Sequence, residues 1–216
     1  MPHIVLNGER QAVGNIFCIG RNYREHAQEL GHAVPQEPLA FLKPTGALLA
    51  VGSPIVLPPY SASVHYECEL VLYIGRRAEY VSAAEAMDYV AGVGIGLDLT
   101  ARDVQSEAKS QGLPWLKAKG FRGSACVSHF VSPDVLPAPD CLGFSLHING
   151  SLRQQGDSGQ MIFSLPQLVA FLSATYGLPA GSLIYTGTPE GVGELQHGDQ
   201  LQLSLHGHID CGFQVA

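Results

Sequence analysis

One strand-like stretch of this chain reads Tyr66-Glu67-Cys68-Glu69-Leu70-Val71-Leu72-Tyr73-Ile74, an apolar run that carries two carboxylates. Side chains alternate between the faces of a strand, so Glu67 and Glu69 project from the same side. Two like charges on a partly buried face repel each other and lose hydration. Carboxylates at this spacing are therefore not expected in an ordinary core strand. A bound cation removes that cost, so the stretch predicts half of a divalent-metal site. The alternative is an edge strand whose glutamates face solvent.

A second run, Ala91 to Leu99, supplies a further carboxylate, Asp98, at its end. Every second residue before it is glycine, and a glycine-lined face lets another group approach the backbone closely. Together with Glu67 and Glu69, Asp98 would form an all-oxygen site. Such a site suits Mg²⁺, Mn²⁺ or Ca²⁺ better than zinc. Alternatively, Asp98 is a turn or capping residue before the next helix.

His26 and Glu29 lie three residues apart in a helical pattern, on one face and within reach of each other. A carboxylate that accepts a hydrogen bond from an imidazole fixes its tautomer and raises its basicity, which suits a general base for water. An ordinary surface pair of histidine and glutamate is the alternative.

The composition indicates a globular protein with a substantial core. Of the 216 residues, 46% are hydrophobic and 14% are charged, with a net charge of -7 and scattered Lys and Arg. This disfavours a nucleic-acid or membrane partner. Five cysteines without a C-x-x-C pair favour reduced thiols. We therefore expect a soluble, cytoplasmic protein with a single catalytic domain over residues 1–216, of which 1–14 form a short N-terminal segment.

Strand patterns dominate without regular alternation of strands and helices, which favours an α+β, β-rich fold: a mixed β-sheet roll with peripheral helices. We expect strands over residues 15–19, 39–43, 66–74, 91–99, 144–148, 182–186, 200–206 and 208–213. We expect helices over residues 22–30, 83–87, 101–109 and 166–175. Thr100 and Asp103 have the spacing of a capping box for the third of these helices.

Two further segments carry polar groups near turns. Of Lys117 and Lys119, we expect one to face solvent, because basic residues in loops usually do. The Gly/Thr turn over residues 186–193 can present backbone N–H groups to an anion such as a carboxylate. It lacks the Gly-Lys-Ser/Thr ending of a phosphate loop.

Taken together, these segments resemble the fumarylacetoacetate hydrolase family, in particular its short, single-domain acylpyruvase-like branch. The resemblance covers residues 15 to 214 in the family's order. The matching segments are Cys18-Ile19-Gly20-Arg21-Asn22-Tyr23, Phe41-Leu42-Lys43-Pro44, His65-Tyr66-Glu67-Cys68-Glu69-Leu70, Leu97-Asp98-Leu99-Thr100-Ala101-Arg102-Asp103-Val104-Gln105, Gly112-Leu113-Pro114-Trp115, Lys119-Gly120-Phe121 and Thr186-Gly187-Thr188-Pro189-Glu190-Gly191-Val192-Gly193.

The resemblance implies a β-roll of the fumarylacetoacetase C-terminal type that is usually a homodimer. It implies Mg²⁺ or Mn²⁺ held by Glu67, Glu69 and Asp98. His26 and Glu29 become the water-activating dyad, on a helical lid that orders over substrate. Lys119 matches the family's lysine near the metal. The matches to substrate-contacting positions are Arg21, Arg102, Gln105 and Thr188. Arg21 has the alternative role of holding the lid.

The expected reaction is hydrolysis of a C–C bond in a 3-acylpyruvate of the fumarylpyruvate or acetylpyruvate type, giving pyruvate and a carboxylic acid. His26, oriented by Glu29, would deprotonate the attacking water. Lys119 and the metal would stabilise the pyruvate enolate that leaves.

The same enolate chemistry permits an oxaloacetate tautomerase or decarboxylase, or a 2-hydroxymuconate-type isomerase. A non-catalytic protein that binds oxo acids is a more distant alternative, because every part of the constellation is present. In each case the ligand is a small 2-oxo acid.

Overall fold

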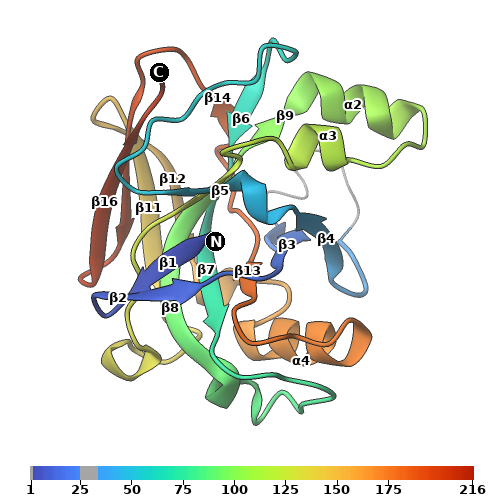
Figure 1. Ribbon diagram of the computed structural model, residues 1–216, viewed down its shortest axis with the longest axis vertical. Helices are drawn as coiled ribbons and strands as arrows, with labels where there is room; N and C mark the ends of the chain where they lie inside the picture. The colour runs from blue at the N-terminus through green and yellow to red at the C-terminus, as the bar shows by residue number, and fades with distance from the viewer. Residues whose placement is uncertain (1, 25–33) are drawn as a thin grey trace.

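The structure, a computed structural model, describes residues 2–24 and 34–216. Its largest element is a seven-stranded mixed sheet in the order β4-β3-β13-β7-β8-β10-β5 (Figure 1). The pairs β13–β3 and β10–β5 are parallel, and the other neighbours are antiparallel. The strands are β3 (Ile16–Gly20), β4 (Leu39–Lys43), β5 (Leu48–Ala50), β7 (Cys68–Ile74), β8 (Val90–Asp98), β10 (Ala125–Val127) and β13 (Leu183–Tyr185).

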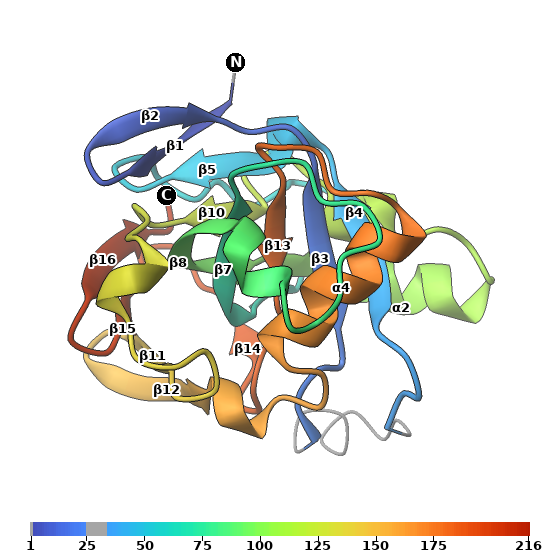
Figure 2. The ribbon, with the colours of Figure 1, turned by 90° about the horizontal axis from the view of Figure 1, so that it is seen from below.

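A four-stranded antiparallel sheet packs beside the first, on the left of Figure 1, in the order β12-β11-β15-β16. Its strands are β11 (Gly143–Ile148), β12 (Ser151–Asp157), β15 (Gln200–Leu205) and β16 (Ile209–Gln214). Three short strands, β6 (Val64–Tyr66), β9 (Thr100–Ala101) and β14 (Gly193–Glu194), form a third sheet. The hairpin of β1 (His3–Leu6) and β2 (Glu9–Ala12) lies at the edge of the molecule in Figure 2.

The helices lie at the periphery, with α2 (Arg102–Ser110) and α3 (Leu116–Lys119) together at one end and α4 (Leu165–Thr175) at the other (Figure 1). Short 3₁₀ helices span Thr45–Ala47, Ala86–Tyr89, Pro133–Val135 and Ser158–Gln160. No helix in the described residues is long and apolar enough to cross a membrane.

Both faces of β7 are buried, which explains its nearly continuous apolar sequence. On one face Leu70 and Leu72 join a core cluster that includes Leu146 and Leu203 from the second sheet. On the other face Val71 belongs to a separate cluster around Phe130 and Tyr185. The expected mixed, rolled β-architecture with peripheral helices is confirmed.

The strand expected over residues 66–74 is interrupted at Glu67. The chain leaves the small sheet after Tyr66, which pairs with Gly193, and enters the large sheet at Cys68, which pairs with Leu97. Glu67 therefore lies where the chain passes from one sheet to the other. The alternation of faces around it could not reveal this change of partner.

The predicted capping box at Thr100 is wrong. Helix α2 begins at Arg102, and its N-cap residue, Ala101, forms no side-chain cap. Thr100 lies in β9, where its hydroxyl donates to Glu67 at 3.1 Å. The carboxylate of Asp103 accepts hydrogen bonds from Ser61 and from the backbone N–H of Ala62. Partners that are distant in sequence thus replace the local cap.

Two other helix predictions differ from the structure. The helix expected over residues 83–87 is replaced by the 3₁₀ helix Ala86–Tyr89. Most of the helix expected over residues 22–30 lies outside the described residues.

The glycine face of β8 is closely approached by neighbouring protein atoms. A Cβ atom on Gly96 would lie 2.3 Å from the carbonyl oxygen of Cys126 on β10 and 3.0 Å from the ring of Tyr185. Gly94 would similarly meet the ring of Phe130 at 3.1 Å. These glycines let β10, the neighbouring strand of the same sheet, and the second core cluster closely approach the strand that ends in Asp98.

Gly96→Ala tests this packing. The added methyl group has no room beside a backbone carbonyl, so we expect a loss of roughly 3 kcal/mol in the free energy of unfolding, measured by urea denaturation. Gly46→Ala is the matched control, because no atom lies within 4 Å of the position that its methyl group would take. Equal stability of the two variants would contradict the close packing.

Candidate functional site

Three buried carboxylates meet where β6 and β8 end and β7 begins. Glu67 and Glu69 come from the junction and start of β7, and Asp98 is the last residue of β8. One oxygen from each residue lies within 4.8 Å of the others. The backbone N–H of Asp98 donates to the carbonyl of Glu67 at 2.8 Å, which fixes the two strand ends against each other.

Cationic side chains surround two of the carboxylates. The ammonium of Lys119 lies 2.7 Å from Glu67 Oε2 and 2.9 Å from Asp98 Oδ2. Arg102 contacts Glu67 Oε1 at 2.6 Å, and Lys43 lies 2.7 Å from Asp98 Oδ1. Glu67 and Asp98 are therefore each bracketed by two positive charges.

Glu69 is different, because no cation of the described residues pairs with it. Its Oε2 accepts a hydrogen bond from the backbone N–H of Gly187 at 2.7 Å. The Gly/Thr turn thus presents an N–H to a carboxylate, as the sequence predicted, and the carboxylate belongs to the protein. Burial raises the pKa of Glu69 well above its usual value, and the nearby charges of Asp98 and Glu67 raise it further.

Lys119 ends the short helix α3 and is buried, whereas Lys117 is exposed. The expectation that one of the two faces solvent is confirmed. Burial alone would lower the pKa of Lys119, but the charges of Asp98 and Glu67 outweigh it, so the pKa is raised. The ammonium also lies 5.0 Å from the centre of the Phe41 ring. Lys119 is therefore a firmly protonated cation at neutral pH.

Helix α2 turns three polar side chains toward the carboxylates. Arg102, Gln105 and Lys109 follow one another at spacings of three and four residues, which places them on one helix face. Arg102 donates to Gln105 Oε1 at 2.9 Å. The Lys109 ammonium lies 5.2 Å from the centre of the Trp115 ring.

The two other residues predicted to contact substrate reach the site from loops. Arg21 follows β3 with a left-handed backbone, φ 59°. Thr188 is buried in the Gly/Thr turn, where its hydroxyl donates to the carbonyl of Cys68 and accepts from Gln154. In this structure the hydroxyl of Thr188 is thus occupied by protein partners.

One pocket collects eight of the ten residues predicted from the sequence. It is lined by Ile19, Gly20, Arg21, Leu39, Phe41, Glu67, Glu69, Asp98, Arg102, Gln105, Lys109, Trp115, Lys119 and Thr188. The other two predicted residues, His26 and Glu29, lie outside the described residues.

Sequence reasoning assigned no role to Lys43 and Gln154, which support the site. Lys43 is the only charged residue of β4, and its side chain is fully buried. The sequence feature that could have indicated its role is a single lysine in an otherwise apolar strand. Gln154 accepts from the backbone N–H of Cys68 at 2.9 Å and donates to Thr188. No local pattern marks Gln154, because both partners come from distant strands and turns.

The donor set fits a hard divalent cation. All three candidate ligands are carboxylates, and they are close enough to share one ion. Asp98 Oδ1 is buried and accepts no hydrogen bond, although Lys43 lies close to it. No cation among the described residues forms an ion pair with Glu69, and the charge of Lys119 only partly offsets the rise in its pKa. Both features leave oxygen lone pairs available in a site where burial makes uncompensated charge costly.

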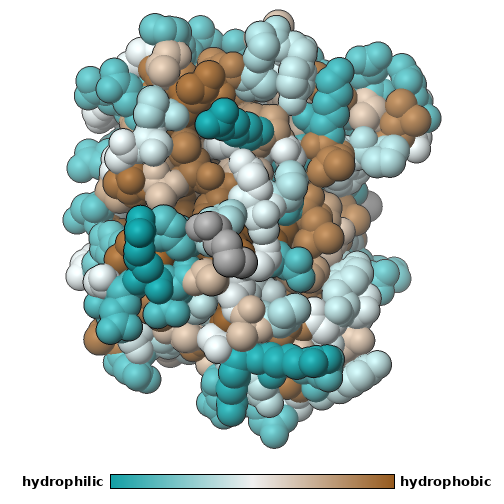
Figure 3. All heavy atoms as spheres, viewed as in Figure 1, coloured by the Kyte–Doolittle hydropathy of each residue, from teal (hydrophilic) through white to brown (hydrophobic). Residues whose placement is uncertain are grey.

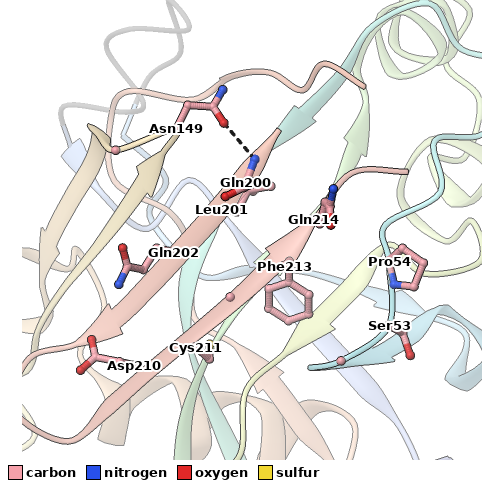
Figure 4. A pocket seen from close by; sticks show the side chains of 13 residues that line it. Ser53, Pro54, Asn149, Gln200, Leu201, Gln202, Asp210, Cys211, Phe213 and Gln214 are labelled. Carbon is pink, nitrogen blue, oxygen red and sulfur yellow. Dashed lines mark hydrogen bonds between the residues drawn. The ribbon is translucent and has the colours of Figure 1, made fainter. Parts of the chain in front are cut away.

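A larger hollow, of about 1000 Å³, lies elsewhere, over β15 and β16 (Figure 4). Asp210 is the only charged residue among those that line it. Most of its other polar groups are amides and hydroxyls, such as Asn149, Gln202 and Ser53 (Figure 4). In the described part of the chain, the chemistry-bearing residues therefore gather at the carboxylate pocket and not in this wider groove.

Comparisons with known proteins agree with the fold and with the carboxylate pocket described above. Residues 15–216 match the family described as fumarylacetoacetate (FAA) hydrolase C-terminal. The mitochondrial oxaloacetate tautomerase FAHD1 of Bos taurus is 46% identical over 201 residues, which cover 93% of this chain and 91% of that protein.

Two solved structures are similar over nearly the whole chain. One is a fumarylpyruvate hydrolase from Pseudomonas aeruginosa in complex with Mn²⁺ and pyruvate, with a TM-score of 0.94, 33% identity, and coverage of 99% of this chain and 95% of that one. The other is a 5-carboxymethyl-2-hydroxymuconate delta-isomerase from Mycobacterium smegmatis, with a TM-score of 0.83, 31% identity, and coverage of 97% and 83%. Sequence match, fold and carboxylate pocket agree, and the chain belongs to the fumarylacetoacetate hydrolase family.

Proposed function

We propose that this protein is a metal-dependent enzyme acting on a small dicarboxylic 2-oxo acid, and that its reaction is the keto–enol tautomerisation of oxaloacetate. One observation carries the proposal: three buried carboxylates share a pocket with a protonated lysine that contacts two of them. The tautomerase relative, at 46% identity, supports this choice among the activities of the family.

Glu67, Glu69 and Asp98 are the residues that would hold Mg²⁺ or Mn²⁺. The Mn²⁺ in the similar fumarylpyruvate hydrolase structure supports such an ion. When bound, the cation would supply Lewis-acid polarisation of the substrate's 2-oxo group and would orient the substrate.

Lys119 supplies the charge that the reaction needs. Tautomerisation moves a proton between C3 and the 2-oxo oxygen, and negative charge develops on that oxygen as the C3 proton leaves. A buried ammonium that is held in place stabilises this charge without reorganisation of water. Because the pKa of Lys119 is raised, it acts here as a hydrogen-bond donor and not as the base.

Arg21 and Lys109 are placed to bind the distal carboxylate. Both line the pocket, and neither pairs with a carboxylate in the part of the chain that the structure describes. Arg102, by contrast, already pairs with Glu67. Burial, with the charges of Arg102, Arg21 and Lys119, lowers the pKa of Lys109, so an anion at this position would relieve repulsion among these cations. A dicarboxylic substrate meets that requirement.

Hydrolysis of an acylpyruvate is the second candidate. It is favoured by the similarity to the fumarylpyruvate hydrolase and by the predicted dyad of His26 and Glu29. Hydrolysis needs a group that activates water, whereas tautomerisation needs only a proton relay. His26 is therefore the residue whose removal separates the two candidates.

The homodimer, the cytoplasmic location and the single-domain organisation stay predictions. Figure 3 shows hydrophobic side chains at the surface on the side where β4 and α3 lie, and Leu42, Leu113 and Leu116 are exposed. These residues support a subunit interface.

All five cysteines are free, which supports a reducing compartment. That the protein has no nucleic-acid or membrane partner also stays a prediction, which rests on its net charge of -7 and its scattered Lys and Arg.

Glu69→Gln tests the metal site. In the metal-free protein, Glu69 has a higher pKa in the folded state than in the unfolded state. Its contribution to the free energy of unfolding is therefore fully present below the unfolded-state pKa of about 4.3, and it is lost as the pH rises through the folded-state pKa. We therefore expect the metal-free variant to be more stable than wild type at pH 7, by at least about 1 kcal/mol or roughly 2–4 °C. The stabilisation by added Mn²⁺ should be lost. Thermal unfolding with EDTA or Mn²⁺ between pH 5 and 8 measures both effects, and a Mn²⁺ shift of wild-type size in the variant would refute the ligand role.

The proposed reaction is tested with the enol form of oxaloacetate. We expect Mn²⁺- or Mg²⁺-loaded protein to accelerate the loss of enol absorbance, and metal-stripped protein to have little effect. Lys119→Met should lower kcat about 10²- to 10³-fold, because it removes a donor to the developing oxyanion. The exposed neighbour variant Lys117→Met is the control and should retain activity. Enol loss at the rate seen in buffer, with loaded wild-type protein, would rule out the tautomerase.

His26→Ala separates the two candidate reactions. We expect hydrolysis of fumarylpyruvate to fall about 10²- to 10⁴-fold, because the general base is lost. Tautomerisation of oxaloacetate should fall at least 10-fold less. Parallel assays of the two substrates with one preparation of protein give this ratio. An equal loss in both reactions would mean that His26 serves a common step.

A further inference from the structure

Lys43 has no assigned role in the reaction, yet it is fully buried directly behind the carboxylate cluster. Its ammonium donates to the carbonyl of Leu99 at 3.0 Å, to the hydroxyl of Ser124 at 3.0 Å and to the carbonyl of Lys119. An ammonium has three protons, so these three acceptors use all of them. The contact with Asp98 Oδ1, at 2.7 Å, is an ion pair without a hydrogen bond.

The three acceptors belong to different parts of the site. Leu99 follows the strand that ends in Asp98, and Lys119 ends helix α3. Ser124 precedes β10, and its hydroxyl also donates to the carbonyl of Lys119 at 2.7 Å. Through these bonds one side chain from β4 ties together the end of β8, the end of α3 and the start of β10.

Asp98 and Lys119 are the two residues whose positions this arrangement sets. Asp98 lies between two ammonium groups, with Lys43 at Oδ1 and Lys119 at Oδ2. The bond from Lys43 to the main-chain carbonyl of Lys119 holds the backbone from which that second ammonium extends. A shift in either residue would alter the cluster at the atoms proposed to bind metal and substrate.

We propose that Lys43 is a positioning residue of the metal site: it fixes the Asp98 carboxylate by charge and the Lys119 backbone by hydrogen bonding. The inference rests on the proposed metal site, and it assigns Lys43 no contact with substrate. It differs from a purely stabilising role, because both routes converge on Asp98: Lys43 contacts Oδ1 directly, and the Lys119 ammonium that it helps to position contacts Oδ2.

A double-mutant cycle on Mn²⁺ affinity tests the inference without any substrate. The dissociation constant of Mn²⁺ is measured by electron paramagnetic resonance for wild type, Lys43→Met, Asp98→Asn and the double variant. Methionine keeps the apolar stem of the lysine and removes its charge and donors. We expect Lys43→Met to weaken Mn²⁺ binding at least 10-fold in wild type and by less than 2-fold in the Asp98→Asn background. Lys117→Met, at an exposed position on the same short helix as Lys119, should match wild type.

The alternative roles give different results. A lysine that only stabilises the fold would lower the melting temperature in both backgrounds and leave the Mn²⁺ affinity of the folded protein unchanged. A lysine that only offsets negative charge would, when removed, make Mn²⁺ bind more tightly. Either result, or equal weakening in both backgrounds, would overturn the inference.

Ser124→Ala covers the case in which Lys43→Met does not fold. It removes one acceptor of the Lys43 ammonium and one donor to Lys119 without burying a new polar group. We expect about 3-fold weaker Mn²⁺ binding, and wild-type affinity would overturn the inference. Wild-type protein that binds Mn²⁺ but turns over no oxo acid would refute the proposed reaction and leave the role of Lys43 standing.

Discussion

The site depends on how a β-rich core accommodates three carboxylates that repel one another. Glu67, Glu69 and Asp98 are all buried, and none would remain ionised there without compensation. Two buried lysines and one arginine provide that compensation for Glu67 and Asp98. Glu69 is left with a backbone N–H and a raised pKa. Cations therefore neutralise Glu67 and Asp98 but do not pair with Glu69. A bound metal ion would be stabilised by the negative charge of Glu69 that the described residues leave unpaired.

The fold serves this cluster by bringing strand ends together. The chain changes sheets at Glu67, and the closely packed glycines of β8 allow β10 to pair tightly beside the strand that ends in Asp98. Helix α2 follows at once and turns its polar face toward the same point. Lys119 and Lys43 reach the cluster from α3 and β4. Elements that are distant in sequence are needed, because no single strand could supply opposite charges at these distances.

Periodicity predicts the three carboxylates of the site, whereas the roles of the other pocket residues are predicted by the resemblance to the family. The alternation around Glu67 and Glu69 placed both on one face, and the position of Asp98 at a strand end was evident from its run. Periodicity could not show which partner a side chain would choose. Thr100 has the local signature of a helix cap, yet its hydroxyl bonds to Glu67, 33 residues away. Lys43 and Leu99 are 56 residues apart, and no local pattern reports such a contact.

Charge balance also bears on the choice of substrate. Counted formally, the charges of the three carboxylates equal those of Lys43, Arg102 and Lys119, although these cations contact only Glu67 and Asp98. A divalent ion bound by the three carboxylates would add two positive charges to this buried cluster. A dianionic 2-oxo acid would offset both charges of the ion, whereas a monoanion would offset only one of them in surroundings of low dielectric. Arg21 and Lys109 at the pocket wall add attraction for the same dianion. Electrostatics thus favours oxaloacetate and fumarylpyruvate over acetylpyruvate, and the presence or absence of water activation then decides between tautomerisation and hydrolysis.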